Sequence, residues 1–232
     1  DLRMDDNPAL RAACAESEEV HAIYIYSINQ MELHNEASCK IEFMIKNLKS
    51  LEKSLDQLNI TLTIIDSDGM NHDSSLILNL INERKITNVY WNNQFGIDEE
   101  SRDKELQELL TINNINFATY DAQVLFPAGT FKTGEGKPYS VFTPFKKRWV
   151  ENFNLDLLDI EFKYMPKIKT SISSNINSFN FSYNKDHSVD MKLWTVGEKE
   201  ALKNLYKYLD KKILSYAKDR NDPIIEGTSR LS

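Results

Sequence analysis

Residues 22–27 read AIYIYS, a short run in which five successive side chains are apolar or aromatic. Because apolar and polar residues do not alternate here, the run indicates a strand buried on both faces, as in a parallel sheet. Comparable β-branched and aromatic runs occur at 60–66 (ITLTIID), 88–93 (NVYWNN) and 115–120 (INFATY). These residue types favour strands, so the sequence predicts four of them.

Helical patterns lie between the predicted strands. From Ile41 to Leu58, apolar side chains recur at steps of three and four residues and form one stripe on a helix. Shorter stripes of the same kind occur at 76–81 and 106–110. Alternating strands and helices imply right-handed crossovers, so we expect an α/β fold with a doubly wound parallel sheet, a Rossmann-like domain over residues 1–122.

The pattern changes in the region that follows, which we assign to an interdomain connector over residues 123–190. Residues 124–149 contain Gly, Pro and aromatic residues without a period, and Pro138 and Pro144 argue against regular helix there. Residues 152–190 are rich in Ser and Asn, which is typical of a linker.

A strongly amphipathic helix is predicted after the connector. It has Glu198 near its start and an apolar stripe that runs from Leu202 to Tyr216. This stripe needs a partner, and too little chain follows to supply one. We therefore assign residues 191–232 to the start of a truncated, all-α second domain.

The composition excludes several classes of protein. Apolar residues make up 41% of the 232 residues and charged residues 27%, which is enough to build a core. No stretch is apolar enough to span a bilayer, and no secretory signal opens the chain. Two cysteines, Cys14 and Cys39, do not indicate a disulfide framework and favour a reducing, cytoplasmic setting. The net charge of −7 argues against this segment being the main nucleic-acid surface, although a basic groove can be supplied elsewhere.

The carboxyl-terminal residues 226–232, EGTSRLS, have the chemistry of an anion site. Backbone N–H groups freed by Gly227, the hydroxyls of Thr228, Ser229 and Ser232, and the guanidinium of Arg230 all suit phosphate oxygens. The alternative interpretation is a frayed polar tail, which is common at chain ends.

Three motifs, in this order and at these distances, resemble the DNA photolyase/cryptochrome family. They are DLRMDDNPAL at 1–10, GKPYSVFTPFKKRW at 136–149 and YAKDRNDPIIEGTSRLS at 216–232. The resemblance runs from Asp1 to Ser232 and points in particular to bacterial cyclobutane pyrimidine dimer photolyases with a folate antenna. It implies that a short first strand precedes Asp1 and that a helical flavin-binding domain follows Ser232.

The resemblance implies a flavin site and a DNA contact near the carboxyl terminus. The residues that hold the FAD phosphates would be Thr228, Ser229, Arg230, Leu231 and Ser232. Tyr216 matches a tyrosine that contacts the flavin, and Arg220 matches an arginine that contacts DNA. Without the family, Tyr216 is a core aromatic residue on the apolar stripe and Arg220 a solvated charge at a helix end.

The resemblance also implies an antenna site for 5,10-methenyltetrahydrofolate. Residues 91–103, WNNQFGIDEESRD, align with the stretch that binds the pterin ring in folate-type relatives through an Asn-Glu pair. Here the pair is Asp98 and Glu99, and a carboxylate accepts hydrogen bonds but does not donate them, so one contact is altered. His34 matches a histidine near the folate. The alternative is an acidic helix start, which the helix dipole favours, and an isolated surface histidine.

The implied activity is light-dependent DNA repair by a deoxyribodipyrimidine photolyase. Reduced FAD, excited through the antenna, would transfer an electron to a cyclobutane pyrimidine dimer flipped out of UV-damaged DNA. No residue of this chain is expected to act as a catalytic acid, base, nucleophile or metal ligand, and the chain alone is expected to be inactive. We expect a monomer with no membrane contact. The alternatives are a cryptochrome-type blue-light receptor, a (6-4) photolyase, and a free-standing folate- or nucleotide-binding module.

Overall fold

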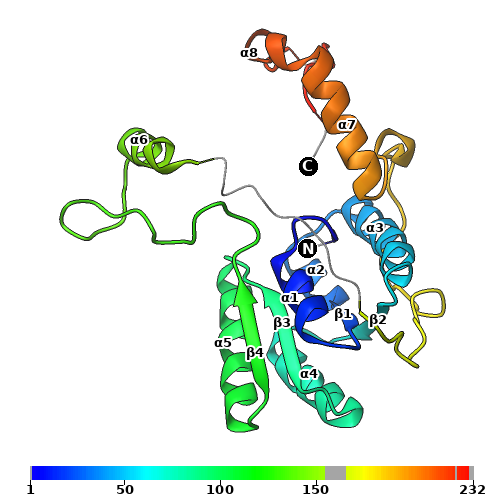
Figure 1. The fold of residues 1–232 in the computed structure, drawn as a ribbon. Coiled ribbons are helices and arrows are strands. Elements are labelled where there is room, and N and C mark those ends of the chain that lie inside the picture. The colour runs from blue at the N-terminus through cyan, green and yellow to red at the C-terminus, as the bar shows by residue number, and fades with distance from the viewer. Residues whose placement is uncertain (1, 155–165, 223, 230–232) are drawn as a thin grey trace.

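The computed structural model describes residues 2–154, 166–222 and 224–229 (Figure 1). The elements of its α/β part are α1 (Pro8–Glu16), β1 (His21–Tyr26), α2 (Ile28–Leu33), α3 (Ser38–Asp56), β2 (Thr61–Asp66), α4 (Met70–Arg84), β3 (Asn88–Asn92), α5 (Ile97–Ile112) and β4 (Asn116–Tyr120). The later elements are α6 (Phe142–Asn152), η2 (Met191–Leu193), α7 (Glu198–Lys211), η3 (Ile213–Ser215) and α8 (Tyr216–Asp219). All four predicted strands are present, with bounds that differ by at most one residue.

The strands pair in parallel, as the sequence predicted. β1 pairs with β2 from His21↔Thr61 to Tyr26↔Asp66, and β3 pairs with β4 from Asn88↔Asn116 to Asn92↔Tyr120. The prediction implied one continuous sheet. In the described residues the strands instead form two separate two-stranded sheets, because β1 and β3 are not hydrogen-bonded to each other.

Helices cover both faces of the strands. On one face, α1 and α3 pack on β1 and β2 through a cluster that includes Tyr26, Leu48 and Ile64, each at most 2% exposed. On the other face, α4 and α5 pack on β1 and β3 through Ile77, Ile81, Leu106 and Leu110. Alternate residues of β1 serve the two clusters, as the pleat of a strand requires. The fold is therefore α/β with helices on both faces of the strands, as predicted, although Tyr26 is the one residue of β1 that is buried.

The region of residues 124–149 differs from the prediction, because α6 begins within it at Phe142. Pro144 is the third residue of α6. A proline is tolerated in the first turn, where its missing N–H would have no intrahelical partner. The segment before α6 folds back on the helix through aromatic contacts, with the rings of Phe126 and Trp149 5.5 Å apart. Proline content alone was therefore not sufficient to exclude a helix from residues 124–149.

The predicted amphipathic helix is also interrupted. α7 ends at Lys211, and two short elements, η3 and α8, follow in place of a continuous helix to Tyr216. At the break, Ser215 N donates to Lys212 O at 3.2 Å, an i→i+3 hydrogen bond of the 3₁₀ type. In Figure 1 these elements extend from the α/β part, and Leu202, Tyr206 and Leu209 of the stripe are exposed.

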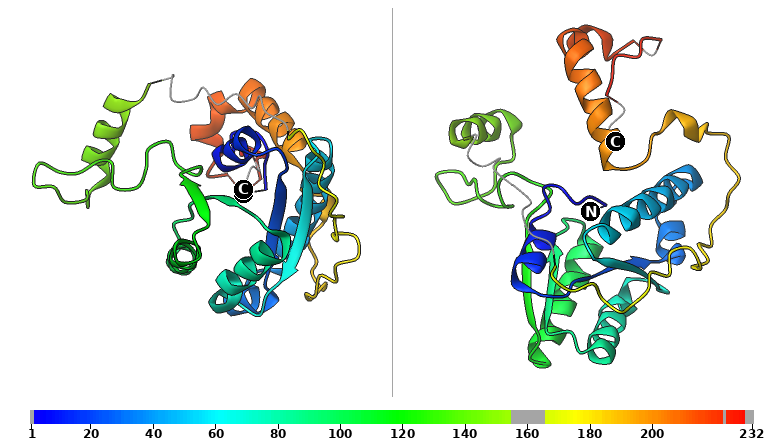
Figure 2. Two further views of the ribbon diagram at one scale, coloured as in Figure 1. Left: turned by 60° about the horizontal axis from the view of Figure 1, so that its bottom comes forward. Right: turned by 45° about the vertical axis from the view of Figure 1, so that its right-hand side comes forward.

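Part of the predicted linker packs against the body. Asn175 lies along the outer edge of β2, where its amide accepts from Ile64 N and donates to Ile64 O, each at 2.8 Å. Ile176 is 1% exposed, and the ring of Phe181 contacts that of Tyr26 edge-on at 5.2 Å. Figure 2 shows this segment, in yellow, passing outside the β1–β2 pair. The Ser/Asn-rich composition predicted irregular backbone correctly and missed the packing.

Candidate functional site

The fold brings His34 and Asp98 together from distant parts of the sequence. His34 ends α2, and Asp98 lies in the first turn of α5. His34 Nε2 is 3.4 Å from Asp98 Oδ2, and the two side chains are 41% and 57% exposed. Even as an ion pair, a contact this open to solvent would stabilise the fold by at most about 1 kcal/mol. The pair therefore contributes little to the stability of the fold, and both side chains remain accessible to a ligand.

Glu99 lies beside this pair and turns its carboxylate back toward the start of α5. A Cβ atom placed on Gly96, the N-cap residue, would lie 1.9 Å from Glu99 Oε2. Any side chain at Gly96 would therefore displace this carboxylate. Part of the arrangement is ordinary helix chemistry, since acidic groups favour the positive end of a helix dipole. The sequence alone did not indicate the close approach to Gly96.

A cavity of about 630 Å³ opens between β1, β3 and the helices around them. Its polar end is lined by His34, Glu99, Gln30, Gln94 and Arg102. These residues follow β1 or β3, so they lie at the carboxyl ends of the strands. At this end, the chain leaves β1 toward β2 on one side of the cavity and leaves β3 toward β4 on the other side. In open α/β sheets, ligands bind at such a switch point.

Two residues at this end of the cavity were not predicted from the sequence. Arg102 donates to Asp103 Oδ1 through Nη2 at 2.6 Å and through Nε at 3.0 Å, and its Nη2 also reaches Gln94 Oε1 at 3.3 Å. Asp103 is 6% exposed, which requires such a partner. A signal was present in the sequence, since Asp103 continues the apolar stripe of Leu106 and Leu110 at helical spacing.

The candidate flavin segment is arranged differently. Tyr216 begins α8 and is 39% exposed, its ring lies edge-on to Tyr208 at 6.2 Å, and the guanidinium of Arg220 sits 5.8 Å from the ring centre. Thr228 is exposed and Ser229 half-buried. The remaining three candidates, Arg230, Leu231 and Ser232, lie outside the described residues. The structure therefore places Tyr216 and Arg220 together, near a turn that ends in two hydroxyl residues.

Gly227 forms a tight turn in the candidate flavin segment. Its own N–H donates to Ile225 O at 2.7 Å, so this particular group is not available to an anion. A Cβ atom at Gly227 would lie 2.6 Å from Asp219 Cβ and 3.1 Å from the Asp219 carbonyl carbon. The absence of a side chain at Gly227 therefore allows the backbone before Thr228 and Ser229 to lie directly against Asp219 in α8.

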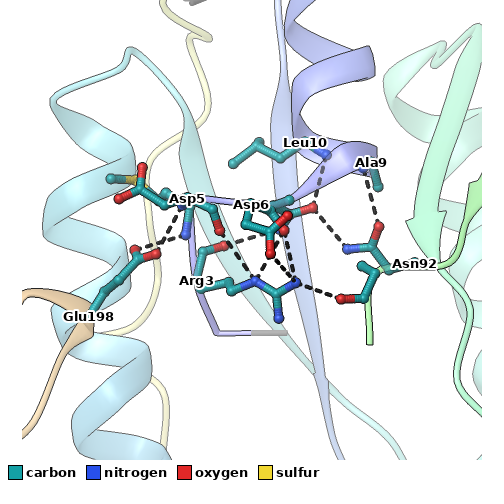
Figure 3. A network of polar contacts seen from close by, with 10 residues as sticks. Arg3, Asp5, Asp6, Ala9, Leu10, Asn92 and Glu198 are labelled. Atoms are coloured by element: carbon teal, nitrogen blue, oxygen red, sulfur yellow. Dashed lines mark hydrogen bonds and ion pairs between the residues drawn. The ribbon is translucent and has the colours of Figure 1, made fainter. Parts of the chain in front are cut away.

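The first residues of the chain connect the α/β part to the start of α7 (Figure 3). Arg3 donates to Asp6 O and to Ala122 O, each at 2.8 Å, and so ties the first loop to the end of β4. The carboxylate of Glu198, the first residue of α7, accepts from Met4 N at 3.0 Å and Asp5 N at 2.9 Å. Residues 3–6 thus anchor the start of α7 to the carboxyl edge of the strands.

Comparison with known proteins gives consistent matches over the whole chain. A family model described as DNA photolyase matches residues 1–166. The deoxyribodipyrimidine photo-lyase of Escherichia coli (strain K12) is 31% identical over 234 residues, covering 100% of this chain and 48% of that protein. Cryptochrome-2 of Arabidopsis thaliana is 25% identical, covering 100% of this chain and 38% of that protein.

A solved structure gives the same result. The crystal structure of a bacterial class III photolyase from Agrobacterium tumefaciens matches with a TM-score of 0.78 and 25% identity, covering 100% of this chain and 47% of that one. The chain therefore spans about half the length of the photolyases that it matches. Within the described residues, no helix combines the length and apolar character needed to cross a membrane.

Proposed function

The chain belongs to the DNA photolyase family, and we propose that it serves light-dependent repair of cyclobutane pyrimidine dimers in UV-damaged DNA. The observation that carries the proposal is the grouping of His34, Asp98 and Glu99 at the carboxyl ends of the strands, beside the cavity. These three residues come from two separate elements, and the family resemblance had singled them out as the antenna site. The fold brings them to one place.

The candidate antenna site has the chemistry that a pterin ring requires. The carboxylates of Asp98 and Glu99 accept hydrogen bonds from ring amino and N–H groups, and His34 adds a group that donates or accepts according to its tautomer. Two hydrogen bonds to Asp103 fix the orientation of the Arg102 guanidinium. We propose that 5,10-methenyltetrahydrofolate binds here, with Glu99 as its main acceptor and the apolar cavity wall beside the ring.

The candidate flavin segment would hold FAD through its exposed groups. Thr228 is exposed, and Tyr216 presents an aromatic face that lies 5.8 Å from the Arg220 guanidinium. Hydroxyls suit phosphate oxygens, and a guanidinium suits a DNA phosphate, which positions the duplex without reading its sequence. We propose that residues 228–232 bind the FAD phosphates and that Arg220 contacts DNA.

When bound, the flavin supplies the light-driven electron transfer that splits the dimer, and the antenna supplies additional light absorption. The residues of this chain bind and orient these groups. The fixed Arg102–Asp103 pair and the packing of Gly227 against α8 both favour preformed sites. No proton transfer by a side chain of the chain is needed for this role.

A second candidate function is blue-light sensing, and the match to Cryptochrome-2 over the full chain favours it. A photolyase for the (6-4) lesion is a further member of the same group. Flavin binding is common to these functions, so the discriminating property is whether a lesion is repaired and which one.

The experiment is a repair assay on the full-length, flavin-loaded and reduced protein. A UV-damaged oligonucleotide is incubated under blue light and in the dark, and the remaining cyclobutane dimers are counted. Loss of dimers in the light alone supports the proposal. Bound flavin without dimer loss, tested beside an oligonucleotide with a (6-4) lesion, would replace it with one of the alternative functions.

A further inference from the structure

The lysines of α7 form a regular stripe along the helix. All the lysines of this helix are spaced four residues apart, and all are exposed: Lys199, Lys203, Lys207 and Lys211. Because residues four apart are neighbours on a helix surface, these side chains follow one another along its length. The stripe spans about 18 Å of helix axis, with roughly one positive charge every 6 Å. We call these residues the lysine stripe, and they present a line of positive charge to solvent.

The lysine stripe differs from the way in which α3 and α5 use lysine. Three lysines of those helices each pair with the glutamate four residues before them, at 2.5 to 2.9 Å: Lys40 with Glu36, Lys46 with Glu42 and Lys104 with Glu100. In the lysine stripe, the residue four positions away is another lysine, and like charges at this spacing destabilise a helix. Among the described residues, Lys203 has Glu200 at 3.4 Å, and no carboxylate lies within 4.0 Å of the other three lysines. An anionic partner would relieve this repulsion.

A shallow surface groove of about 660 Å³ follows the lysine stripe. It is lined by the four lysines, by Leu202 and Tyr206 from the neighbouring apolar stripe, and by Asp210. Tyr206 is 67% exposed, so its ring and hydroxyl are open to a ligand. With one aspartate against four lysines, the groove has a net charge of +3. Positive charges arranged in a line suit an extended polyanion better than a compact anion.

The basic character continues beyond the lysine stripe. From Glu198 to Arg220 the chain carries seven lysine and arginine residues and four aspartate and glutamate residues, a net charge of +3, whereas the whole chain has a net charge of −7. One of the four acidic residues, Glu198, is engaged by Met4 N and Asp5 N. Lys218 and Arg220 are both exposed. Within an acidic chain this region is therefore basic, and it includes Arg220, the proposed DNA contact.

A DNA duplex has the charge distribution that the lysine stripe requires. Its phosphates place one negative charge at about every 1.7 Å of helix axis, so a stretch of about 18 Å carries about ten phosphates. Each of the four lysines can therefore reach a phosphate while the duplex remains straight. Lysine binds phosphate as a point charge, so such contacts hold the duplex without reading its sequence.

We propose that the lysine stripe is an auxiliary DNA-binding surface, which holds the phosphate backbone of the duplex in addition to the contact at Arg220. The choice of DNA as the partner rests on the proposed function, whereas the position of the surface rests on the structure. Each neutralised phosphate releases a counterion, so the four lysines should contribute about 3 to 4 to the slope of log affinity against log salt concentration. The surface adds affinity for duplex DNA whether or not the DNA is damaged.

The test measures how salt affects the binding of an undamaged duplex to the full-length, flavin-loaded protein, by fluorescence anisotropy. One variant combines Lys199→Gln, Lys203→Gln, Lys207→Gln and Lys211→Gln, because Gln and Lys have similar helix propensities. A second variant has Arg in place of Lys at the same four positions and so keeps the charge. The matched control removes the same charge from exposed lysines elsewhere and combines Lys40→Gln, Lys85→Gln, Lys104→Gln and Lys167→Gln.

We expect the unmodified protein, the arginine variant and the control to lose affinity to the same extent as salt rises. The glutamine variant of the lysine stripe should lose about 100-fold less affinity than these three when salt rises from about 50 to about 200 mM. At the lower salt concentration, it should bind the duplex more weakly than they do.

Three outcomes would overturn the proposal. The first is the same salt dependence in the glutamine variant and the unmodified protein. The second is an equal change in the control, which would assign the effect to net charge. The third is loss of binding to phosphatidylserine vesicles in the glutamine variant while its DNA binding is unchanged, which would assign the lysine stripe to a membrane surface.

The repair assay separates this proposal from the proposed function. Light-dependent dimer repair together with an unchanged salt dependence in the glutamine variant would remove the auxiliary surface and leave the proposed function. A reduced salt dependence in that variant, with no light-dependent repair by the unmodified protein, would support the auxiliary surface and contradict the proposed function.

Discussion

The two candidate sites of this chain differ in how far the described fold assembles them. His34, Asp98 and Glu99 come from two separate elements and already meet beside a cavity at the ends of the strands. Tyr216, Arg220, Thr228 and Ser229 lie on short elements beyond α7, where the apolar stripe is exposed. The fold of the strands brings the candidate antenna residues together, whereas the candidate flavin residues lie in one continuous stretch of the chain.

The largest expected difference is in ligand binding by the 232-residue chain itself. Because the candidate flavin residues Tyr216 and Thr228 are exposed, FAD should bind this chain at least about 100-fold more weakly than it binds the full-length protein, the equivalent of two lost hydrogen bonds to charged groups. Methenyltetrahydrofolate should bind measurably to both. Fluorescence titration of each ligand checks this. Equal FAD affinity for the two forms would remove the distinction between the sites.

Glu99→Gln sharpens the comparison at the antenna site. Replacing an ionised acceptor with a neutral amide of the same shape should weaken methenyltetrahydrofolate binding about tenfold, since hydrogen bonds to charged groups are the stronger ones. Glu105→Gln, on the same helix and exposed, is the matched control and should bind as the unmodified chain does. If the two variants bind alike, Glu99 is only part of an acidic helix start.

Asn175 covers the outer edge of β2 with two hydrogen bonds, whereas β1 and β3 are not hydrogen-bonded to each other. Asn175→Ala removes both amide contacts to Ile64, which leaves backbone groups without a partner, and should lower the free energy of unfolding by about 1–3 kcal/mol. Asn177→Ala, at an exposed position two residues away, should change it by less than about 0.5 kcal/mol. Urea unfolding measures both. An equal effect of the two substitutions would mean that the connector does not seal this edge.

His21 predicts a smaller, pH-dependent effect at the amino end of the cavity. Burial, followed by the positive charge of Arg84, lowers the pKa of His21 to about 4, and Arg84 Nη1 donates to His21 Nδ1 at 2.8 Å. The unfolded chain therefore takes up a proton before the folded one does. The free energy of unfolding is therefore highest above about pH 6.5 and decreases as the pH falls toward 4. The decrease is roughly 1–2 kcal/mol once partial exposure of the ring is considered.

His21→Gln should flatten this part of the stability profile, measured by urea unfolding between pH 4 and pH 7. Arg84→Met should keep most of the slope, because burial is the larger cause of the lowered pKa. A profile that is the same with and without His21 would assign the slope to other groups.

The sequence predicted the strands well because their signal is local. β-branched and aromatic runs such as AIYIYS identify buried strands without any knowledge of their neighbours. The helix α6 was missed because a proline excludes helix interiors but not first turns, and Pro144 lies in a first turn. The break after Lys211 left no sequence signal, since the apolar spacing continues through it.

The resemblance singled out His34 and Glu99 as candidate antenna residues but did not give their arrangement. That both line one end of the cavity depends on which strands lie side by side. The Arg102–Asp103 pair was missed although Asp103 occupies a position in an apolar stripe. The close approach of Gly227 to Asp219 depends on how the backbone folds back on α8, so the local sequence pattern did not indicate it.

The most direct measurement is the action spectrum of dimer repair by the full-length, reduced flavoprotein, compared with its Glu99→Gln variant in the presence of methenyltetrahydrofolate. We expect light-dependent loss of dimers, with a near-UV contribution from the antenna that falls relative to the blue contribution in the variant. An absence of light-dependent repair would contradict the proposed function. Repair with an identical spectrum in the two proteins would contradict the placement of the antenna at Glu99.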